Sequence, residues 1–145
     1  MDKVYVEATY KSLNKLNEEL CGDRVEIVKN DDSYFVVLSD GLGSGVKANI
    51  LSTLTSKIIS TMMFQGASIE DTVETIVHTL PVCSVRKVAY STFMILQISY
   101  DGNAYLVEFD SPGCIFVRDG RLMNIEYNYR SIAGKEIKEA HFKVK

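Results

Sequence analysis

The chain has 145 residues, of which 46% are hydrophobic and 24% are charged, and its formal net charge is −3. This length predicts a single domain, spanning residues 1–145, with a sizeable core, and the charge pattern argues against a nucleic-acid partner. We find neither a signal peptide nor an apolar run long enough to cross a membrane, and therefore expect a cytoplasmic protein.

The first part of the chain predicts three strands. Val4–Tyr10 and Arg24–Val28 both alternate between apolar and polar residues, as strands with one buried face do. Asn30–Ser33 has the composition of a turn. It leads into Phe35–Leu38, a continuous apolar run that predicts a strand with both faces covered.

Two helices are expected next. Val46–Gln65 has apolar residues at helical spacing, and Ser68–Asp71 resembles a capping box that opens a second helix ending near Leu80. We expect the two helices to form a hairpin that covers one face of a sheet. The predicted apolar stripe of the first helix consists of Ile50, Leu51, Leu54, Ile58, Ile59, Met62 and Met63.

The rest of the chain predicts a run of strands. Ser91–Tyr100, Ala104–Asp110, Cys114–Arg118 and Arg121–Ile125 are separated by short turn signals, as in an antiparallel meander. The tail, Lys135–Lys145, alternates only weakly and predicts no terminal element. Strands in an antiparallel meander with a helical pair indicate an α+β layered sandwich.

The segment that follows the central strand has the chemistry of a binding site. Asp40 lies where the strand ends, and Gly41 begins a turn containing three glycines, where backbone or ligand can come close. A carboxylate beside a backbone carbonyl suits a hard cation, which prefers oxygen ligands. Asp23 is predicted on or beside the neighbouring antiparallel strand, which would bring a second carboxylate to the same end of the sheet.

The same residues allow two other interpretations, and both stay open on the residues alone. Asp40 can simply cap the following helix, and Asp23 can be an ordinary turn aspartate. A glycine-rich turn can also cradle a phosphate. However, the spacing is Gly-x-Gly-x-Gly, and Lys47 does not stand in a Gly-Lys-Ser/Thr context, so this interpretation is the weakest.

The cysteines and histidines suggest no catalytic or zinc-binding cluster. Cys21, Cys83 and Cys114 are too few and too scattered for a disulfide framework or a zinc site. His78 lies in a helical pattern and His141 in the charged tail, so we expect both to be structural.

The order of these motifs resembles a known family. Gly22-Asp23, then Ser39-Asp40-Gly41-Leu42-Gly43-Ser44-Gly45 with Ala48, a helix pair, and Tyr90-Ser91-Thr92 opening a long strand are similar to the metal-dependent (PPM-type, 2C-like) serine/threonine phosphatases. The resemblance is greatest to their stage II sporulation E branch. It implies an α-β-β-α layered sandwich of antiparallel sheets with a helical hairpin.

The resemblance also implies a mechanism. Members of the family hold two Mn²⁺ or Mg²⁺ ions, and carried over by position Asp40 would bridge both, Gly41 would offer its carbonyl and Asp23 would bind one. Asp23 and Asp40 are therefore the expected catalytic residues. A metal-activated water would hydrolyse phosphoserine or phosphothreonine in a regulatory protein of the anti-anti-sigma type.

Members of the family carry two further metal-binding aspartates that we do not find downstream of Gly120. We therefore expect the chain to hold the N-terminal and central part of the family domain, with an incomplete C-terminus. The alternative to a phosphatase is a truncated, catalytically inactive module that acts in protein–protein regulation. An open sheet edge in such a module would favour homodimers.

Overall fold

The computed structural model describes residues 3–13, 22–41, 45–79, 91–132 and 134–144. Its elements in chain order are β1 (Asp23–Lys29), β2 (Ser33–Gly41), α1 (Gly45–Phe64), α2 (Ile69–Thr79), β3 (Ser91–Ser99), β4 (Asn103–Phe109), β5 (Val117–Arg118), β6 (Arg121–Leu122), β7 (Asn128–Ile132) and β8 (Lys135–Lys143).

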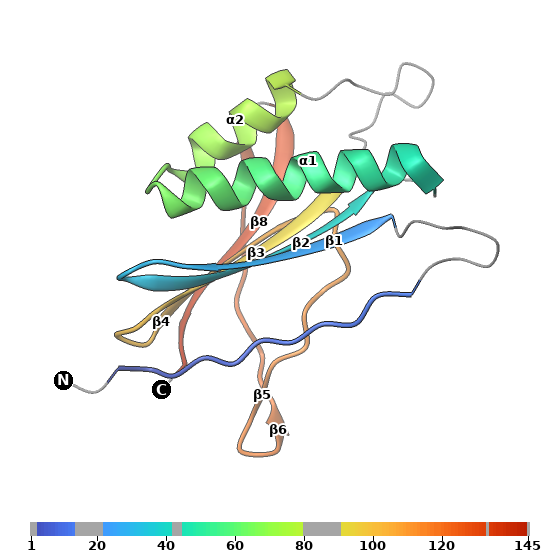
Figure 1. The fold of residues 1–145 in the computed structure, drawn as a ribbon. Coiled ribbons are helices and arrows are strands. Elements are labelled where there is room, and N and C mark those ends of the chain that lie inside the picture. Colours follow the sequence, from blue (N-terminus) through green and yellow to red (C-terminus); the bar gives the residue numbers. More distant parts are fainter. Residues whose placement is uncertain (1–2, 14–21, 42–44, 80–90, 133, 145) are drawn as a thin grey trace.

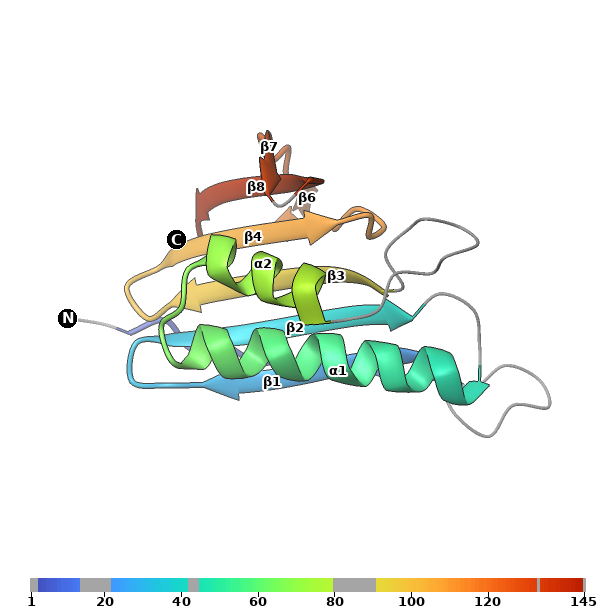
Figure 2. The same ribbon diagram turned by 90° about the horizontal axis from the view of Figure 1, so that it is seen from above.

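One large antiparallel sheet carries the fold. Its six strands run in the order β1-β2-β3-β4-β8-β7, and β5 pairs with β6 in a separate two-stranded ribbon. Helices α1 and α2 lie together over one face of the large sheet (Figures 1 and 2). The extended N-terminal segment and the β5–β6 ribbon lie on the other side (Figure 1). The predicted α+β class, antiparallel sheet and helical hairpin are therefore confirmed.

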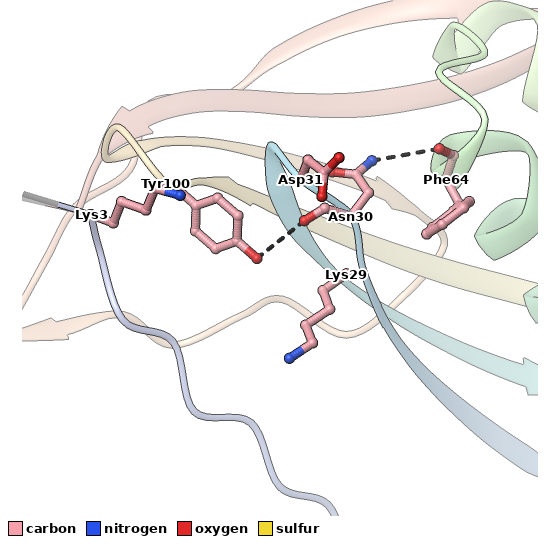
Figure 3. Close-up of a pocket in the computed structure, with 6 residues that line it drawn as sticks. All are labelled: Lys3, Lys29, Asn30, Asp31, Phe64 and Tyr100. Carbon is pink, nitrogen blue, oxygen red and sulfur yellow. Dashed lines mark hydrogen bonds between the residues drawn. The ribbon is translucent and has the colours of Figure 1, made fainter. Parts of the chain in front are cut away.

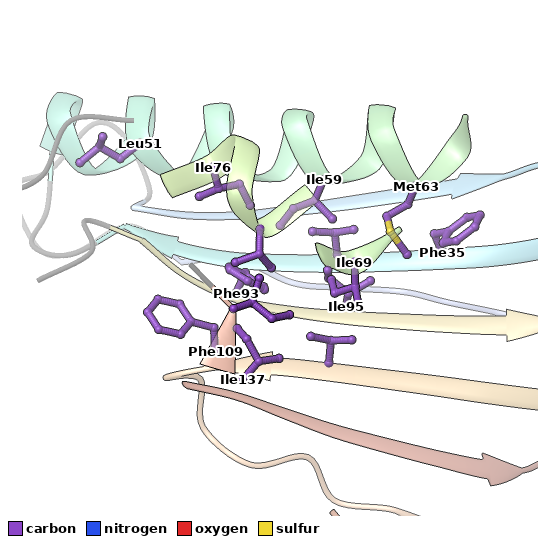
Figure 4. Close-up of a cluster of buried hydrophobic side chains, with 14 residues drawn as sticks. Phe35, Leu51, Ile59, Met63, Ile69, Ile76, Phe93, Ile95, Phe109 and Ile137 are labelled. Atoms are coloured by element: carbon purple, nitrogen blue, oxygen red, sulfur yellow. The ribbon is translucent and has the colours of Figure 1, made fainter. Parts of the chain in front are cut away.

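The main hydrophobic core fills the space between the helices and the sheet (Figure 4). Ile59 of α1, Val73 of α2 and Ile95 of β3 are almost fully buried there. Burial of large aliphatic side chains of this kind contributes about 1.5–3 kcal/mol each. This layer fixes the helices against the sheet and so sets where α1 begins.

Strand β2 alternates, contrary to the prediction that both of its faces are covered. Phe35, Val37 and Ser39 are buried on the helix side, whereas Val36 is half-buried and Leu38 is 37% exposed. The helices thus cover only one face of β2. The unbroken apolar run wrongly predicted that the second face is buried as well. Residues of β2 at even positions, Asp40 among them, lie on the face away from the helices.

The predicted apolar stripe of α1 is correct in part. Leu51, Ile59 and Met63 are buried, but Ile50 and Leu54 are exposed. Ala48 and four small hydroxyl residues hold the remaining buried positions of α1, and a search for apolar periodicity cannot find the hydroxyl residues. They are Ser52, Thr55, Ser56 and Ser60.

Local signals in the sequence were reliable where side chains or backbone dihedrals fix a turn. The Ser68 hydroxyl accepts the Asp71 amide at 3.1 Å, which confirms the predicted cap of α2. Asp119 and Gly120 both have positive φ, at 53° and 77°, as the two-residue turn between β5 and β6 requires.

Three strand predictions need correction. Val4–Tyr10 forms no strand, although it alternates, because a strand needs a paired neighbour and this segment has none within the described chain. The predicted strands Cys114–Arg118 and Arg121–Ile125 shorten to β5 and β6. The tail, expected to be irregular, contributes β8 to the interior of the sheet and pairs with β7 at its edge.

No helix within the described part of the chain is long and apolar enough to span a membrane.

Candidate functional site

The two predicted carboxylates meet at one end of the sheet. Asp23 is the first residue of β1 and Asp40 is the last but one of β2, and the two are direct partners in the antiparallel register. Side chains of direct cross-strand partners lie on the same face with their Cβ atoms about 4.5–5.5 Å apart. Both residues are exposed. The structure therefore brings Asp23 and Asp40 together, as the sequence predicted.

Gly41 joins this pair to the start of α1. Its amide donates to the Gly22 carbonyl oxygen at 2.8 Å, which ties the end of β2 to the residue before β1. A Cβ placed on Gly41 would lie 2.1 Å from the Ala48 carbonyl oxygen. The backbone at Gly41 thus packs directly against the first turns of α1, where only glycine fits.

Strand β3 adds a third side chain that the sequence did not single out as a site residue. Thr92 is the register partner of Asp40, on the side away from Asp23. The buried Ser39 hydroxyl donates to the Thr92 carbonyl oxygen at 3.2 Å, which reinforces this register. Thr92 could not be placed from the sequence because the pairing of β2 with β3 depends on the intervening helices.

The donor atoms at this end of the sheet are of the kind that a hard cation prefers, but they are few. Two carboxylates and the Gly41 backbone offer oxygen donors only, which suits Mg²⁺ or Mn²⁺. Within the described ranges, no group of three or more His, Cys, Asp or Glu residues could hold a metal. Residues 42–44 of the predicted turn, Gly43 and Ser44 among them, lie outside the described residues.

Cys114 has no features of a nucleophile. Burial, together with a hydrogen bond to the Glu108 carboxylate, raises the pKa of its thiol to about 12. A thiol of this kind is protonated at neutral pH and reacts slowly. Cys21 and Cys83 lie outside the described residues, so the structure does not test their interpretation.

Two charged networks join elements of the fold among the described residues. In one, Glu26 of β1 pairs with Arg24 and with Lys57 of α1.

The other network centres on Glu139. The Glu139 carboxylate accepts from the Tyr105 hydroxyl and pairs with Arg130, which also reaches Glu70 of α2 at 2.6 Å. Burial is the main cause that raises the pKa of Tyr105, with Glu139 adding to it. His141 stacks on the Tyr105 ring, with ring centroids 4.5 Å apart. The network joins α2 to the sheet rather than forming a second catalytic site.

Comparisons with known proteins concern the fold that carries these residues. The family model described as stage II sporulation protein E (SpoIIE) matches residues 30–131, a span that includes Asp40 and Gly41 but not Asp23. A comparison with curated proteins gives no match.

Solved structures show the same fold at low sequence identity. The PP2C phosphatase domain of SpoIIE from Bacillus subtilis, with a fragment of its regulatory domain, is 19% identical, with a TM-score of 0.76 over 93% of this chain. RsbX in complex with magnesium is also 19% identical, with a TM-score of 0.64 over 93% of this chain. A Mycobacterium tuberculosis structure of RsbU and RsbW domains is 13% identical, with a TM-score of 0.70 over 89%.

The chain is shorter than the proteins it resembles. It spans 41% of the SpoIIE chain, 66% of the RsbX chain and 38% of the chain with RsbU and RsbW domains.

Proposed function

Because the chain belongs to the stage II sporulation protein E family, we propose that it acts as a metal-dependent phosphatase on phosphoserine or phosphothreonine in a regulatory protein. The observation that carries this proposal is the register pairing of Asp23 with Asp40 beside the backbone of Gly41. The family membership and the PP2C fold stand on the comparisons, whereas the activity of this chain is our proposal.

The residues at this site fit a divalent cation. The carboxylates of Asp23 and Asp40 and the Gly41 carbonyl would hold Mn²⁺ or Mg²⁺. The family resemblance implies two such ions. Such cations lower the pKa of bound water and neutralise the charge of a phosphoryl group. Without that neutralisation the two carboxylates would repel a phosphate ester, so metal dependence follows from the charge of the site itself.

The surrounding backbone serves to hold the carboxylates in place. The contact between Gly41 and Ala48 fixes the end of β2 against α1, and the hydrogen bond from Ser39 to Thr92 fixes it against β3. Neighbours that hold a ligand in position are often as important for metal affinity as the ligand itself.

The similar structures are consistent with a regulatory protein as partner. Those structures include a protein with RsbU and RsbW domains and one described with the bacterial stressosome, a modular system adapted to control secondary messenger signalling. We propose a substrate of the anti-anti-sigma type for this chain, in keeping with the resemblance of its motifs. The cytoplasmic location stays a prediction.

The second candidate function is a catalytically inactive module that binds a regulatory protein. It is favoured by the small ligand set, since the described site offers two carboxylates and a divalent cation takes about six oxygen ligands. Such a module would bind metal weakly or not at all and would not turn over a phosphate ester.

Phosphatase assays with p-nitrophenyl phosphate and a phosphoserine peptide, with and without Mn²⁺, test the proposal. We expect turnover that requires Mn²⁺, is abolished by EDTA, and falls at least about 100-fold in Asp40→Asn and Asp23→Asn. Asp119→Asn is the matched control, because Asp119 lies in the β5–β6 turn and asparagine tolerates its positive φ. Turnover without metal, or equal turnover in Asp40→Asn and Asp119→Asn, would contradict the assignment. Mn²⁺ binding or partner binding without any turnover would favour the second candidate.

A further inference from the structure

A hollow of about 600 Å³ lies at the other end of the sheet from Asp23 and Asp40 (Figure 3). The two ends are separated by the length of β2, which at about 3.3 Å per residue is about 25 Å. The volume falls within the range of small-molecule sites. The hollow is lined by Lys3, Lys29, Asn30, Asp31, Phe64 and Tyr100.

Hydrogen bonds hold the walls of this hollow in place. The Tyr100 hydroxyl donates to the Asn30 carbonyl oxygen at 3.2 Å, and the Asn30 side-chain oxygen accepts the amides of Asp32 and Ser33. The amide of Val4 donates to the Tyr100 carbonyl oxygen at 2.9 Å, which fixes the N-terminal segment beside Tyr100. The hollow is therefore built from segments that are already positioned, and a ligand would not have to order them.

A second hollow, also of about 600 Å³, lies along the N-terminal segment. It is lined by residues 5–9, Ile27 and Tyr34. The Tyr34 ring meets the Tyr100 ring edge-on, with centroids 5.6 Å apart, and Lys29 is the register partner of Tyr34. The Tyr100 ring of the first hollow therefore contacts the Tyr34 ring of the second. The second hollow also contains the Tyr5 ring, exposed to 79%, and the Glu7 carboxylate, which accepts from the Tyr5 hydroxyl at 3.2 Å.

The charges in the first hollow favour an anion. Neither Lys3 nor Lys29 forms an ion pair within the described part of the chain. Lys3 instead places its ammonium group 5.5 Å from the centre of the Tyr100 ring, and Lys29 extends toward the N-terminal segment (Figure 3). Asp31 is the only carboxylate in the lining, so the ammonium groups outnumber it.

We propose that the first hollow binds a small aromatic anion, an aromatic phosphate or carboxylate. Its anionic group would lie between Lys3 and Lys29, and its ring would pack against Tyr100, whose own ring is held edge-on by Tyr34. Aromatic rings pack favourably edge-on or offset against tyrosine, and an ammonium group that already faces a ring can contact both the ring and the anion. The site shares no residue with the proposed metal site and does not rest on the proposed function.

Adenosine 5′-monophosphate (AMP) combines both chemical features and serves as the probe, titrated into the 145-residue chain and followed by calorimetry and NMR. Metal-free buffer keeps any phosphatase activity out of the experiment. We expect saturable AMP binding below about 1 mM, with adenosine and inorganic phosphate each at least about tenfold weaker. Amide shifts should change at Asn30, Asp31 and Tyr100 and not at Asp40, and high salt should weaken binding.

Four variants make the test specific. Lys3→Gln and Lys29→Gln should each weaken AMP binding about fivefold to tenfold, since each removes a charged partner of the anion. Asp31→Asn should tighten it about twofold to fivefold by removing the opposing charge. The matched control is Lys11→Gln, which makes the same charge change at an exposed lysine on the N-terminal segment that does not line either hollow.

All of these side chains are exposed, so the variants are expected to fold, and the thermal midpoint of each checks this. The proposal is overturned if AMP does not saturate below about 10 mM, if phosphate binds as tightly as AMP, or if the two pocket lysines behave as Lys11 does. Asp40→Asn should bind AMP as the unaltered chain does, so loss of phosphatase activity and loss of this site are separate results.

Discussion

Replacing Gly41 with alanine should force the end of β2 and the first turns of α1 apart. An added Cβ would lie 2.1 Å from the Ala48 carbonyl oxygen and 2.8 Å from its carbonyl carbon. Non-bonded contacts between carbon and oxygen begin at about 3.0–3.4 Å, so one of the two backbones must move by about 1 Å.

The cost of this movement can be estimated from its surroundings. Overpacking a well-packed interior costs about 1–3 kcal/mol of unfolding free energy. The opposing atoms belong to a helix backbone, and Ala48 is fully buried, so no flexible side chain can yield. We therefore expect the upper end of that range, about 3 kcal/mol, and a fall in the melting temperature of about 10 °C for a chain of this size.

Urea and thermal denaturation of Gly41→Ala measure this loss, and Gly113→Ala provides the control. A Cβ on Gly113 meets no atom within 4 Å, and Gly113 does not have a positive φ. Its substitution should therefore change the unfolding free energy by less than about 0.5 kcal/mol. If the two variants unfold within about 0.5 kcal/mol of each other, the close approach of α1 to Gly41 is not what holds this end of the sheet.

Three further changes test other parts of the fold. Ser68→Ala removes the hydroxyl that accepts the Asp71 amide, so urea denaturation should show a loss of about 1 kcal/mol, and an unchanged midpoint would contradict the cap. Arg130→Met leaves the Glu139 carboxylate, only 9% exposed, without its guanidinium partner; we expect a loss of about 1–3 kcal/mol, and no loss would mean that water replaces the pair. The pKa of Cys114 is raised to about 12, so its alkylation should keep accelerating from pH 8 to pH 10 without reaching a plateau. The measurement uses a variant in which Cys21 and Cys83 are replaced by serine. Because the folded thiol holds its proton more tightly than the unfolded thiol, stability should also fall as the pH rises above about 8.5.

The central part of the fold was predictable because local signals and long-range pairing agree there. The turn at Asn30, the cap at Ser68 and the turn at Asp119 each depend on residues close in sequence. The site was predictable for the same reason, since Asp23 and Asp40 belong to strands joined by a short turn, which sets their register. Thr92 was not, because its partnership with Asp40 crosses both helices.

The C-terminal strands were missed because their buried face carries charge. Ile137 and Glu139 are both buried in β8, and a buried glutamate is a position that no pattern of apolar alternation would mark as internal. Arg130 of the neighbouring β7 and Tyr105 of β4 both contact the Glu139 carboxylate, and Tyr105 lies 34 residues away in sequence. Val4–Tyr10 was wrongly predicted as a strand because alternation alone does not reveal whether a partner strand is present, and the described chain provides none.

The unusual composition of α1 and the glycine at the site have one physical explanation. The helix turns serine and threonine toward the sheet, and Ser52, Thr55 and Ser56 donate to carbonyl oxygens of the helix itself, at 2.8–3.1 Å, so their burial leaves no unpaired hydroxyl. Small side chains on this face let the helix backbone approach the sheet, and Gly41 allows the closest approach at the end of β2. The same strand end carries Asp40. A shift of α1 toward or away from the sheet would therefore change the position of Asp40 relative to Asp23.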